Sequence, residues 1–181
     1  MCGASIHMQA WGWVRGWFAG AVILMLVGLG RAAATESLPK PSTAPILVIA
    51  GKIAATNADG TAEFDLALLK SLPEVTIKTV TPWTEGEHDF AGVRLRDLLA
   101  RIGAGSDAVT ASAADDYQVS IPAVDFGTRD VIVAYALDGK PLPVEDKGPL
   151  WIVYPFSSEP SLQKDIYFAR CVWQLKRLQV E

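Results

Sequence analysis

The clearest alternation of hydrophobic and polar positions lies in residues 76–102, TIKTVTPWTEGEHDFAGVRLRDLLARI. Apolar and polar side chains alternate at its start, which predicts a half-buried strand that ends near Thr81, before a proline. Further on, apolar side chains recur at the spacing of one helical face, at Leu95, Leu98, Leu99 and Ile102. We therefore predict a strand, a loop over residues 82–90 that contains Trp83, and an amphipathic helix.

Shorter apolar runs bounded by proline, glycine or aspartate predict the other elements. Strands are predicted over residues 46–50, 109–113, 117–121, 131–137, 150–154 and 171–180. Helical turns are predicted at 66–71, with Asp65 as the N-cap, and at 124–127. A change of phase at Lys176 and Arg177 predicts a β-bulge in the last strand. Because strands dominate, we predict an α+β fold with a mixed, largely antiparallel sheet and few short helices.

The first 34 residues have the pattern of a secretory signal peptide. Arg15 precedes an apolar run over residues 17–29, and small residues suited to cleavage follow it up to Ala34. The run is shorter than the roughly 20 residues that cross a bilayer. We therefore expect a cleaved signal and a periplasmic or secreted protein, with membrane attachment only if this segment is retained.

Residues 35–45 are rich in proline, serine and threonine, and they predict a flexible lead-in to one domain over residues 46–181. The chain has 16 Lys and Arg against 20 Asp and Glu, and loss of the two arginines in the signal leaves 14 against 20, or −6. An acidic domain of this kind is a poor partner for nucleic acid.

Cysteine usage restricts the chemistry further. Cys2 lies in the predicted signal peptide, which leaves Cys171 alone after cleavage and excludes an intramolecular disulfide or a cysteine-rich metal site. Cys171 stands between Phe168 and Trp173, so we expect a buried, inert thiol.

Five segments, in this order, resemble the oxidoreductase molybdopterin-binding domain, which has the sulfite-oxidase-like fold. They are FAGVRLRDLL at residues 90–99, DYQVSIP at 116–122, VIVAYALDGKPL at 131–142, KGPLWIVYP at 147–155 and CVWQL at 171–175. The resemblance spans most of residues 46–180. It implies the α+β fold of that family and, with less force, its oxidoreductase chemistry.

The residues that would bind the family's cofactor are replaced. The resemblance implies a molybdenum-binding cysteine within residues 79–83, which read TVTPW and contain no sulfur. Lys147 stands where a histidine is implied, and Trp151 stands where an arginine is implied. Arg170 and Lys147 are the nearest remaining cations for a pterin phosphate.

Two hypotheses follow from the resemblance and its missing residues. The first is an exported, non-catalytic module without a cofactor, which binds a small-molecule ligand or serves as accessory to a periplasmic partner protein. The alternative is a molybdopterin-dependent oxidoreductase in which Thr81, Thr84 or groups supplied by a partner replace the missing cysteine, or in which the dithiolene of the pterin alone holds molybdenum.

No catalytic or metal-binding residue is predicted. The candidate residues of the former cofactor cleft are Thr81, Trp83, Thr84, Tyr117, Trp151, Tyr154 and Arg170. Their aromatic members either bind a planar or apolar ligand or fill the volume as core. His88 follows two glutamates in the loop and is expected to be solvated rather than bound to a metal, and Asp115 and Asp116 are expected to form a turn.

Overall fold

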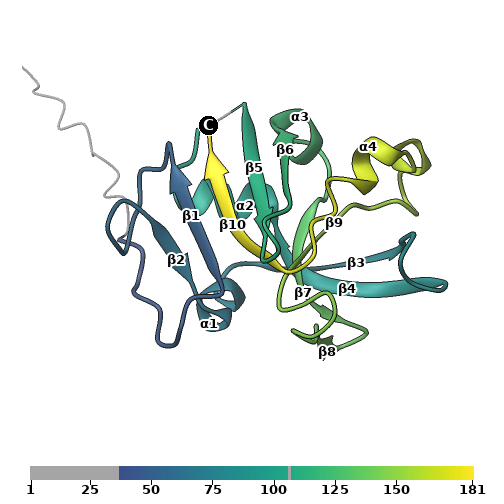
Figure 1. Cartoon of the computed structure of the whole chain (residues 1–181), viewed down its shortest axis with the longest axis horizontal. Helices are drawn as coiled ribbons and strands as arrows, with labels where there is room; N and C mark the ends of the chain where they lie inside the picture. Colours follow the sequence, from purple (N-terminus) through teal and green to yellow (C-terminus); the bar gives the residue numbers. More distant parts are fainter. Residues whose placement is uncertain (1–36, 106) are drawn as a thin grey trace, which may run out of the picture. The chain divides into compact units, whose positions relative to one another are not determined.

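A computed structural model describes residues 37–105 and 107–181, which form two β-sheets with a few short helices (Figure 1). The signal peptide predicted for residues 1–34 lies outside the described residues. Within the described ranges, no helix is both long enough and apolar enough to cross a membrane.

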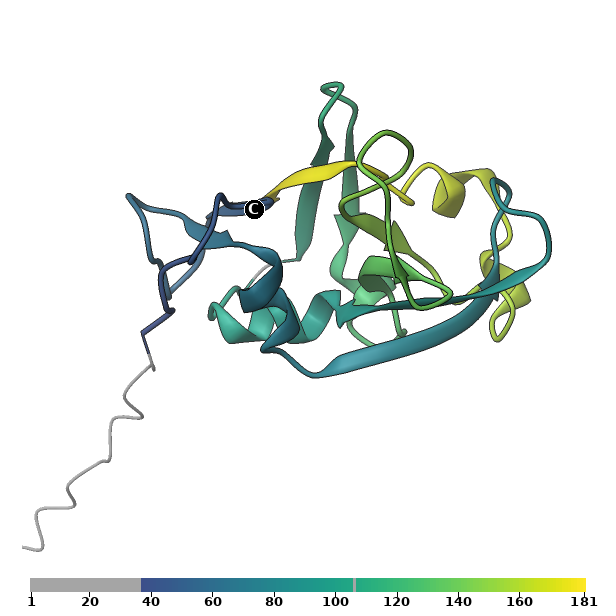
Figure 2. The ribbon, with the colours of Figure 1, turned by 90° about the horizontal axis from the view of Figure 1, so that it is seen from below.

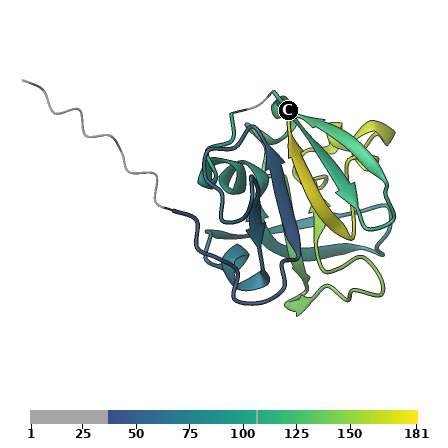
Figure 3. The same ribbon diagram turned by 60° about the vertical axis from the view of Figure 1, so that its left-hand side comes forward.

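The first sheet joins strands from both ends of the domain. In spatial order its strands are β2 (Ala62–Phe64), β1 (Leu47–Gly51), β10 (Leu175–Val180), β5 (Ala108–Ala113) and β6 (Gln118–Pro122). Figure 3 shows β10, in yellow, between β1 and β5. The β1–β10 pair is parallel and the other pairs are antiparallel, so the predicted mixed, largely antiparallel sheet is confirmed. The pairing of β10 with β5 shifts between Leu175 and Arg177, where the sequence predicted a bulge.

The second sheet is built around β7 (Ile132–Leu137). In spatial order it contains β3 (Glu74–Val80), β4 (Glu87–Arg94), β7 and β8 (Lys140–Pro141), and β9 (Trp151–Val153) also pairs with β7. Strand β7 buries Val133 and Tyr135 toward one core cluster and Ile132 and Ala134 toward another, as expected for an apolar central strand.

Strand β4 corrects the prediction of a long loop over residues 82–90. All seven residues of β3 pair antiparallel with residues of β4, so the predicted strand and loop form a hairpin. The sequence did not indicate this strand, because residues 87–89 are polar and show no alternation of apolar and polar positions. Only Phe90 is buried in the first half of β4. Figure 2 shows this curved hairpin, whose tip reaches the segment that contains α4 (Asp165–Phe168).

The helices are short and lie between strands. They are α1 (Leu66–Lys70), α2 (Leu95–Arg101), α3 (Ala123–Phe126), α4 (Asp165–Phe168) and the 3-10 helix η1 (Pro160–Leu162). Asp65 caps α1 by accepting a hydrogen bond from the Leu68 backbone N–H, as predicted. Helix α2 buries Leu95, Leu98 and Leu99 in the core between the two sheets.

Two further segments differ from the prediction. The last strand was predicted from residue 171 but begins at Leu175, because residues 171–174 follow α4 as irregular backbone, and α4 itself was missed. In the predicted flexible lead-in, Leu38 is buried, and Ser42 and Thr43 donate hydrogen bonds to Asp65. The described part of the lead-in is therefore docked on the domain.

Candidate functional site

A cavity of about 400 Å³ lies where the tip of the β3–β4 hairpin meets the β5–β6 turn and the segment from α4 to β10. We call it the aromatic cavity. Its aromatic lining residues are Trp83, Tyr117, Phe168 and Trp173, its acidic ones are Asp115 and Asp165, and the rest are Ala113, Ala169, Cys171 and Val172. Among the residues that the structure describes, no lysine, arginine or histidine lines the aromatic cavity.

Trp83 is the centre of the aromatic cluster. Its ring meets Phe168 edge-on at a centroid distance of 6.2 Å and Trp173 at 5.2 Å. Behind it, Trp151 makes a similar contact at 5.9 Å, and Trp151 in turn packs against Phe90 at 5.3 Å. Trp83 therefore separates the cavity from the smaller of the two core clusters.

Tyr117 connects two walls of the cavity. It follows the turn at Asp115 and Asp116, where Asp115 Oδ1 accepts the Tyr117 backbone N–H at 3.2 Å. The Tyr117 hydroxyl donates to the Ala169 carbonyl oxygen at 2.8 Å, just after α4. Tyr117 is 45% exposed, so it stands at the surface of the domain.

Thr81 and Thr84 are bonded to each other at the hairpin tip. Their hydroxyl oxygens lie 2.8 Å apart, and Thr81 Oγ1 also accepts the Trp83 backbone N–H at 3.2 Å. Thr81 is buried and faces a second, smaller cavity beside Phe156 and Phe168. The two hydroxyls therefore fix the turn that presents Trp83.

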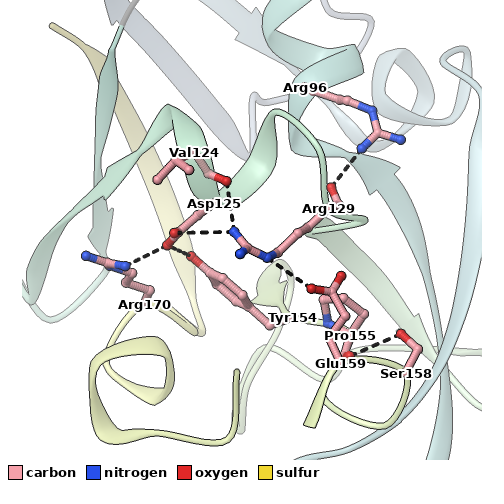
Figure 4. A network of polar contacts seen from close by, with 9 residues as sticks. All are labelled: Arg96, Val124, Asp125, Arg129, Tyr154, Pro155, Ser158, Glu159 and Arg170. Atoms are coloured by element: carbon pink, nitrogen blue, oxygen red, sulfur yellow. Dashed lines mark hydrogen bonds and ion pairs between the residues drawn. The ribbon is translucent and has the colours of Figure 1, made fainter. Parts of the chain in front are cut away.

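Tyr154 and Arg170 belong to a buried polar network around Asp125 (Figure 4). The Asp125 carboxylate accepts the Tyr154 hydroxyl at 2.9 Å and Arg170 Nη1 at 2.7 Å, and Asp125 is only 2% exposed. Burial, followed by the nearby Asp125 charge, raises the pKa of Tyr154. A buried carboxylate requires such partners. The positive charge of Arg170 is therefore already paired with the Asp125 carboxylate.

Arg129 extends the network toward β9. Arg129 Nη1 lies 3.9 Å from Asp125 Oδ1 and donates to the Val124 carbonyl oxygen at 2.8 Å, and Arg129 Nε donates to Glu159 at 3.0 Å (Figure 4). The network thus ties α3 to the loop after β9 and to the segment after α4.

Cys171 lies in the cavity wall as a protonated thiol. The residue is buried, its Sγ contacts the Tyr167 carbonyl oxygen at 3.5 Å, and burial raises the pKa of the thiol. The buried location matches the prediction. A thiol in such surroundings is a poor nucleophile, because the reactive form is the thiolate.

The remaining candidates lie away from the aromatic cavity. His88 is on β4, where its Nδ1 lies 2.7 Å from Asp138 Oδ2, and this interaction raises its pKa. Lys147 pairs with Asp146 at 2.8 Å. Across residues 37–105 and 107–181, no group of three or more His, Cys, Asp or Glu side chains is placed to hold a metal ion.

Only some of the predicted aromatic site residues line the aromatic cavity. Trp83 and Tyr117 line the aromatic cavity, whereas Trp151 and Tyr154 are buried behind it. Sequence reasoning missed Phe168, Trp173 and Asp165 as lining residues. The aromatic character of the sequence around Cys171 was the available signal, but it was interpreted as the packing of a strand.

Comparison with known proteins supports this fold. The family model of the oxidoreductase molybdopterin-binding domain matches residues 53–180. No curated protein matches the sequence. Among solved structures, the sulfane dehydrogenase SoxCD from Paracoccus pantotrophus is similar, with a TM-score of 0.56 and 20% sequence identity.

That structural similarity covers 74% of this chain but only 37% of the sulfane dehydrogenase chain, so it shows a shared fold over about a third of that protein. The family match covers more than two thirds of this chain and includes the segments that resemble the family in the sequence. The chain therefore belongs to the oxidoreductase molybdopterin-binding domain family.

Proposed function

We propose that this chain is an exported, non-catalytic member of its family, and that its aromatic cavity binds a small-molecule ligand in place of the cofactor. The observation that carries the proposal is the composition of the cavity wall. Four aromatic side chains and two carboxylates line it, and none of its described lining residues is basic.

This wall does not fit the family's cofactor. A pterin phosphate is anionic and calls for arginine or lysine donors, yet Asp115 and Asp165 are the charged residues at the cavity. Arg170, the nearest cation by sequence reasoning, is bound to the buried Asp125 at 2.7 Å. The cavity would therefore repel the phosphate rather than hold it.

The residues at the position of the implied metal ligand are equally ill suited to bind molybdenum. The family resemblance implies a cysteine thiolate, a soft donor, as the molybdenum ligand, and no cysteine stands in residues 79–83. The Thr81 hydroxyl is already hydrogen-bonded to Thr84 and to the Trp83 backbone N–H.

The cavity is suited to a small ligand in size and chemistry. Its volume of about 400 Å³ falls within the roughly 300–1,000 Å³ of small-molecule sites, which are mostly lined by apolar and aromatic groups with a few polar ones. The thiol of Cys171 and the ring of Trp83 lie in this wall.

Benzyl alcohol, a neutral planar probe, tests the site directly. Trp83, Trp151 and Trp173 are the tryptophans of residues 35–181, so three indole N–H signals in an NMR spectrum report on the domain. We expect saturable shifts of the Trp83 and Trp173 signals on titration, and loss of saturation in Tyr117→Ala, which alters an exposed side chain. The control Val124→Ala changes a residue that is 68% exposed and outside the cavity lining, and should bind as the parent does.

Absence of saturable binding by the neutral probe and by a cationic one, in a folded protein, would contradict the proposed function. Export is tested separately by mass spectrometry of protein recovered from outside the cytoplasm. We expect a chain that starts near residue 35, and a chain that keeps residues 1–34 would contradict a cleaved signal.

A further inference from the structure

The two carboxylates at the aromatic cavity have no cationic partner among residues 37–105 and 107–181. No ion pair or side-chain hydrogen bond to a basic group is formed by Asp115 or Asp165 within the described residues, whereas Lys147 pairs with Asp146 and Arg170 pairs with Asp125. Asp115 Oδ1 accepts only the Tyr117 backbone N–H. The cavity therefore carries net negative charge next to an apolar wall.

The aromatic rings are arranged as walls rather than as a stack. The Phe168 ring is inclined at 81° to the Trp83 ring, and the Trp173 ring is inclined at 80°. Rings at these angles meet edge to face and are not stacked on one another. The faces of aromatic rings carry the negative part of the ring quadrupole and attract cations placed over them.

Tyr117 adds a wall on the solvent side. Its hydroxyl is anchored to the Ala169 carbonyl oxygen at 2.8 Å, which holds the ring across the gap between the β5–β6 turn and α4. Asp115 and Asp165 lie in these same two segments. Aromatic walls and carboxylates thus surround one space from three parts of the chain.

We propose that the aromatic cavity binds a small organic cation, such as a quaternary ammonium or alkylated amine without an anionic group. This inference rests on the proposed function that the cavity binds a ligand, and it names the ligand's chemical class. Aromatic boxes recognise quaternary ammonium groups by cation–π attraction. The carboxylates of Asp115 and Asp165 supply the complementary charge and repel zwitterions and anions.

A matched pair of probes isolates the effect of charge. The probes are choline and the uncharged alcohol in which a tert-butyl group replaces its trimethylammonium group. Binding is followed by the indole signals of Trp83 and Trp173. We expect choline to bind about tenfold more tightly than the isostere at low ionic strength, because cation–π and carboxylate attraction act only on the charged probe.

Two variants, one of them a double substitution, identify the source of that preference. Asp115→Asn with Asp165→Asn should reduce it to about threefold or less, since only the ring faces then favour the cation. Asp116→Asn is the matched control, because Asp116 lies in the same turn but does not line the cavity. It should retain nearly the full preference.

The outcomes separate the two proposals. Equal affinities for choline and its isostere would overturn the organic-cation inference while the binding function stood. An unchanged preference in the Asp115→Asn, Asp165→Asn protein would overturn the role of the carboxylates. Failure of both choline probes and of benzyl alcohol would overturn the inference together with the proposed function.

Discussion

Single carboxylates hold together parts of this chain that lie far apart in sequence. Asp65 caps α1 and accepts hydrogen bonds from Ser42 and Thr43, which dock the lead-in. Asp125 accepts hydrogen bonds from Tyr154 and Arg170 and so joins α3 to the segments around β9 and α4. Both carboxylates are buried, and their partners offset the cost of removing a charge from water.

Tyr154→Phe removes one hydrogen bond to the buried Asp125 carboxylate. We expect it to lower the free energy of unfolding by about 1.5–3 kcal/mol, the usual range for hydrogen bonds to charged groups, measured by urea denaturation. Tyr135→Phe is the matched control, because the Tyr135 hydroxyl donates to Glu74 on an exposed position of β3. It should cost about 1 kcal/mol or less, and equal costs would contradict a special role of Asp125.

Asp65→Asn tests the charge of the helix cap through pH. The Leu68 backbone N–H, followed by the Ser42 hydroxyl, lowers the pKa of Asp65 in the folded protein. A lowered pKa stabilises the fold at neutral pH, and this stabilisation is lost as pH falls below the unfolded value of about 4. The difference in unfolding free energy between parent and variant should therefore shrink from neutral pH to about pH 3. A difference that does not change with pH would contradict a stabilising role of the Asp65 charge.

At the level of elements, the β3–β4 hairpin carries Trp83 to the cavity, and its position depends on how β4 meets β7. The register of that pair shifts between Ala91 and Gly92. A Cβ on Gly92 would collide with the Val133 carbonyl oxygen and lie 2.6 Å from Ala134 Cα. The close approach of the two backbones explains the glycine in the family-like FAGVRLRDLL segment.

Gly92→Ala should therefore be strongly destabilising. The backbone of β7 must move to admit the methyl group, and we expect a loss of about 2 kcal/mol or more in the free energy of unfolding. Gly105→Ala is the control, since a Cβ there meets nothing within 4 Å, and should change stability by no more than about 0.5 kcal/mol. Comparable effects of the two substitutions in thermal unfolding would show that the close approach is unimportant.

The elements that sequence reasoning found are those with strong periodicity or flanking turn residues. Helix α2 and strands β1, β3, β5 and β7 were predicted to within two residues at each end. Strand β4 was missed because its charged first half hides the alternation, and the four residues of α4 are too few to show a helical period.

The sequence identified only part of the cavity lining for the same reason, because it shows local patterns but not how distant segments pack together. Trp83 and Tyr117 were identified because they are aromatic residues of segments that the family resemblance places around the cofactor cleft. Trp151 and Tyr154 were grouped with them, but their run is buried on both faces and lies behind the cavity. The contribution of Phe168 and Trp173 depends on how α4 is placed against the hairpin, which no local pattern specifies.

At the level of the whole molecule, the chain keeps the family's fold, and we propose that the chemistry of its cavity differs from that of a cofactor site. The frame is preserved because its segments form the two sheets and the core between them. The cavity wall is independent of that requirement, since surface loops and short helices supply it. A family fold can therefore be kept while the residues of such a wall change.

The central claim, that this family member works without the family's cofactor, is tested most directly by the content of purified protein. The chain should be expressed in a host that makes the molybdenum cofactor, then assayed for molybdenum and tungsten by elemental analysis and for pterin by fluorescence after oxidative release. We predict neither metal nor pterin in a folded protein that unfolds cooperatively. Near-stoichiometric metal and pterin would contradict the account, and would favour an oxidoreductase with a ligand near Thr81 or groups supplied by a partner.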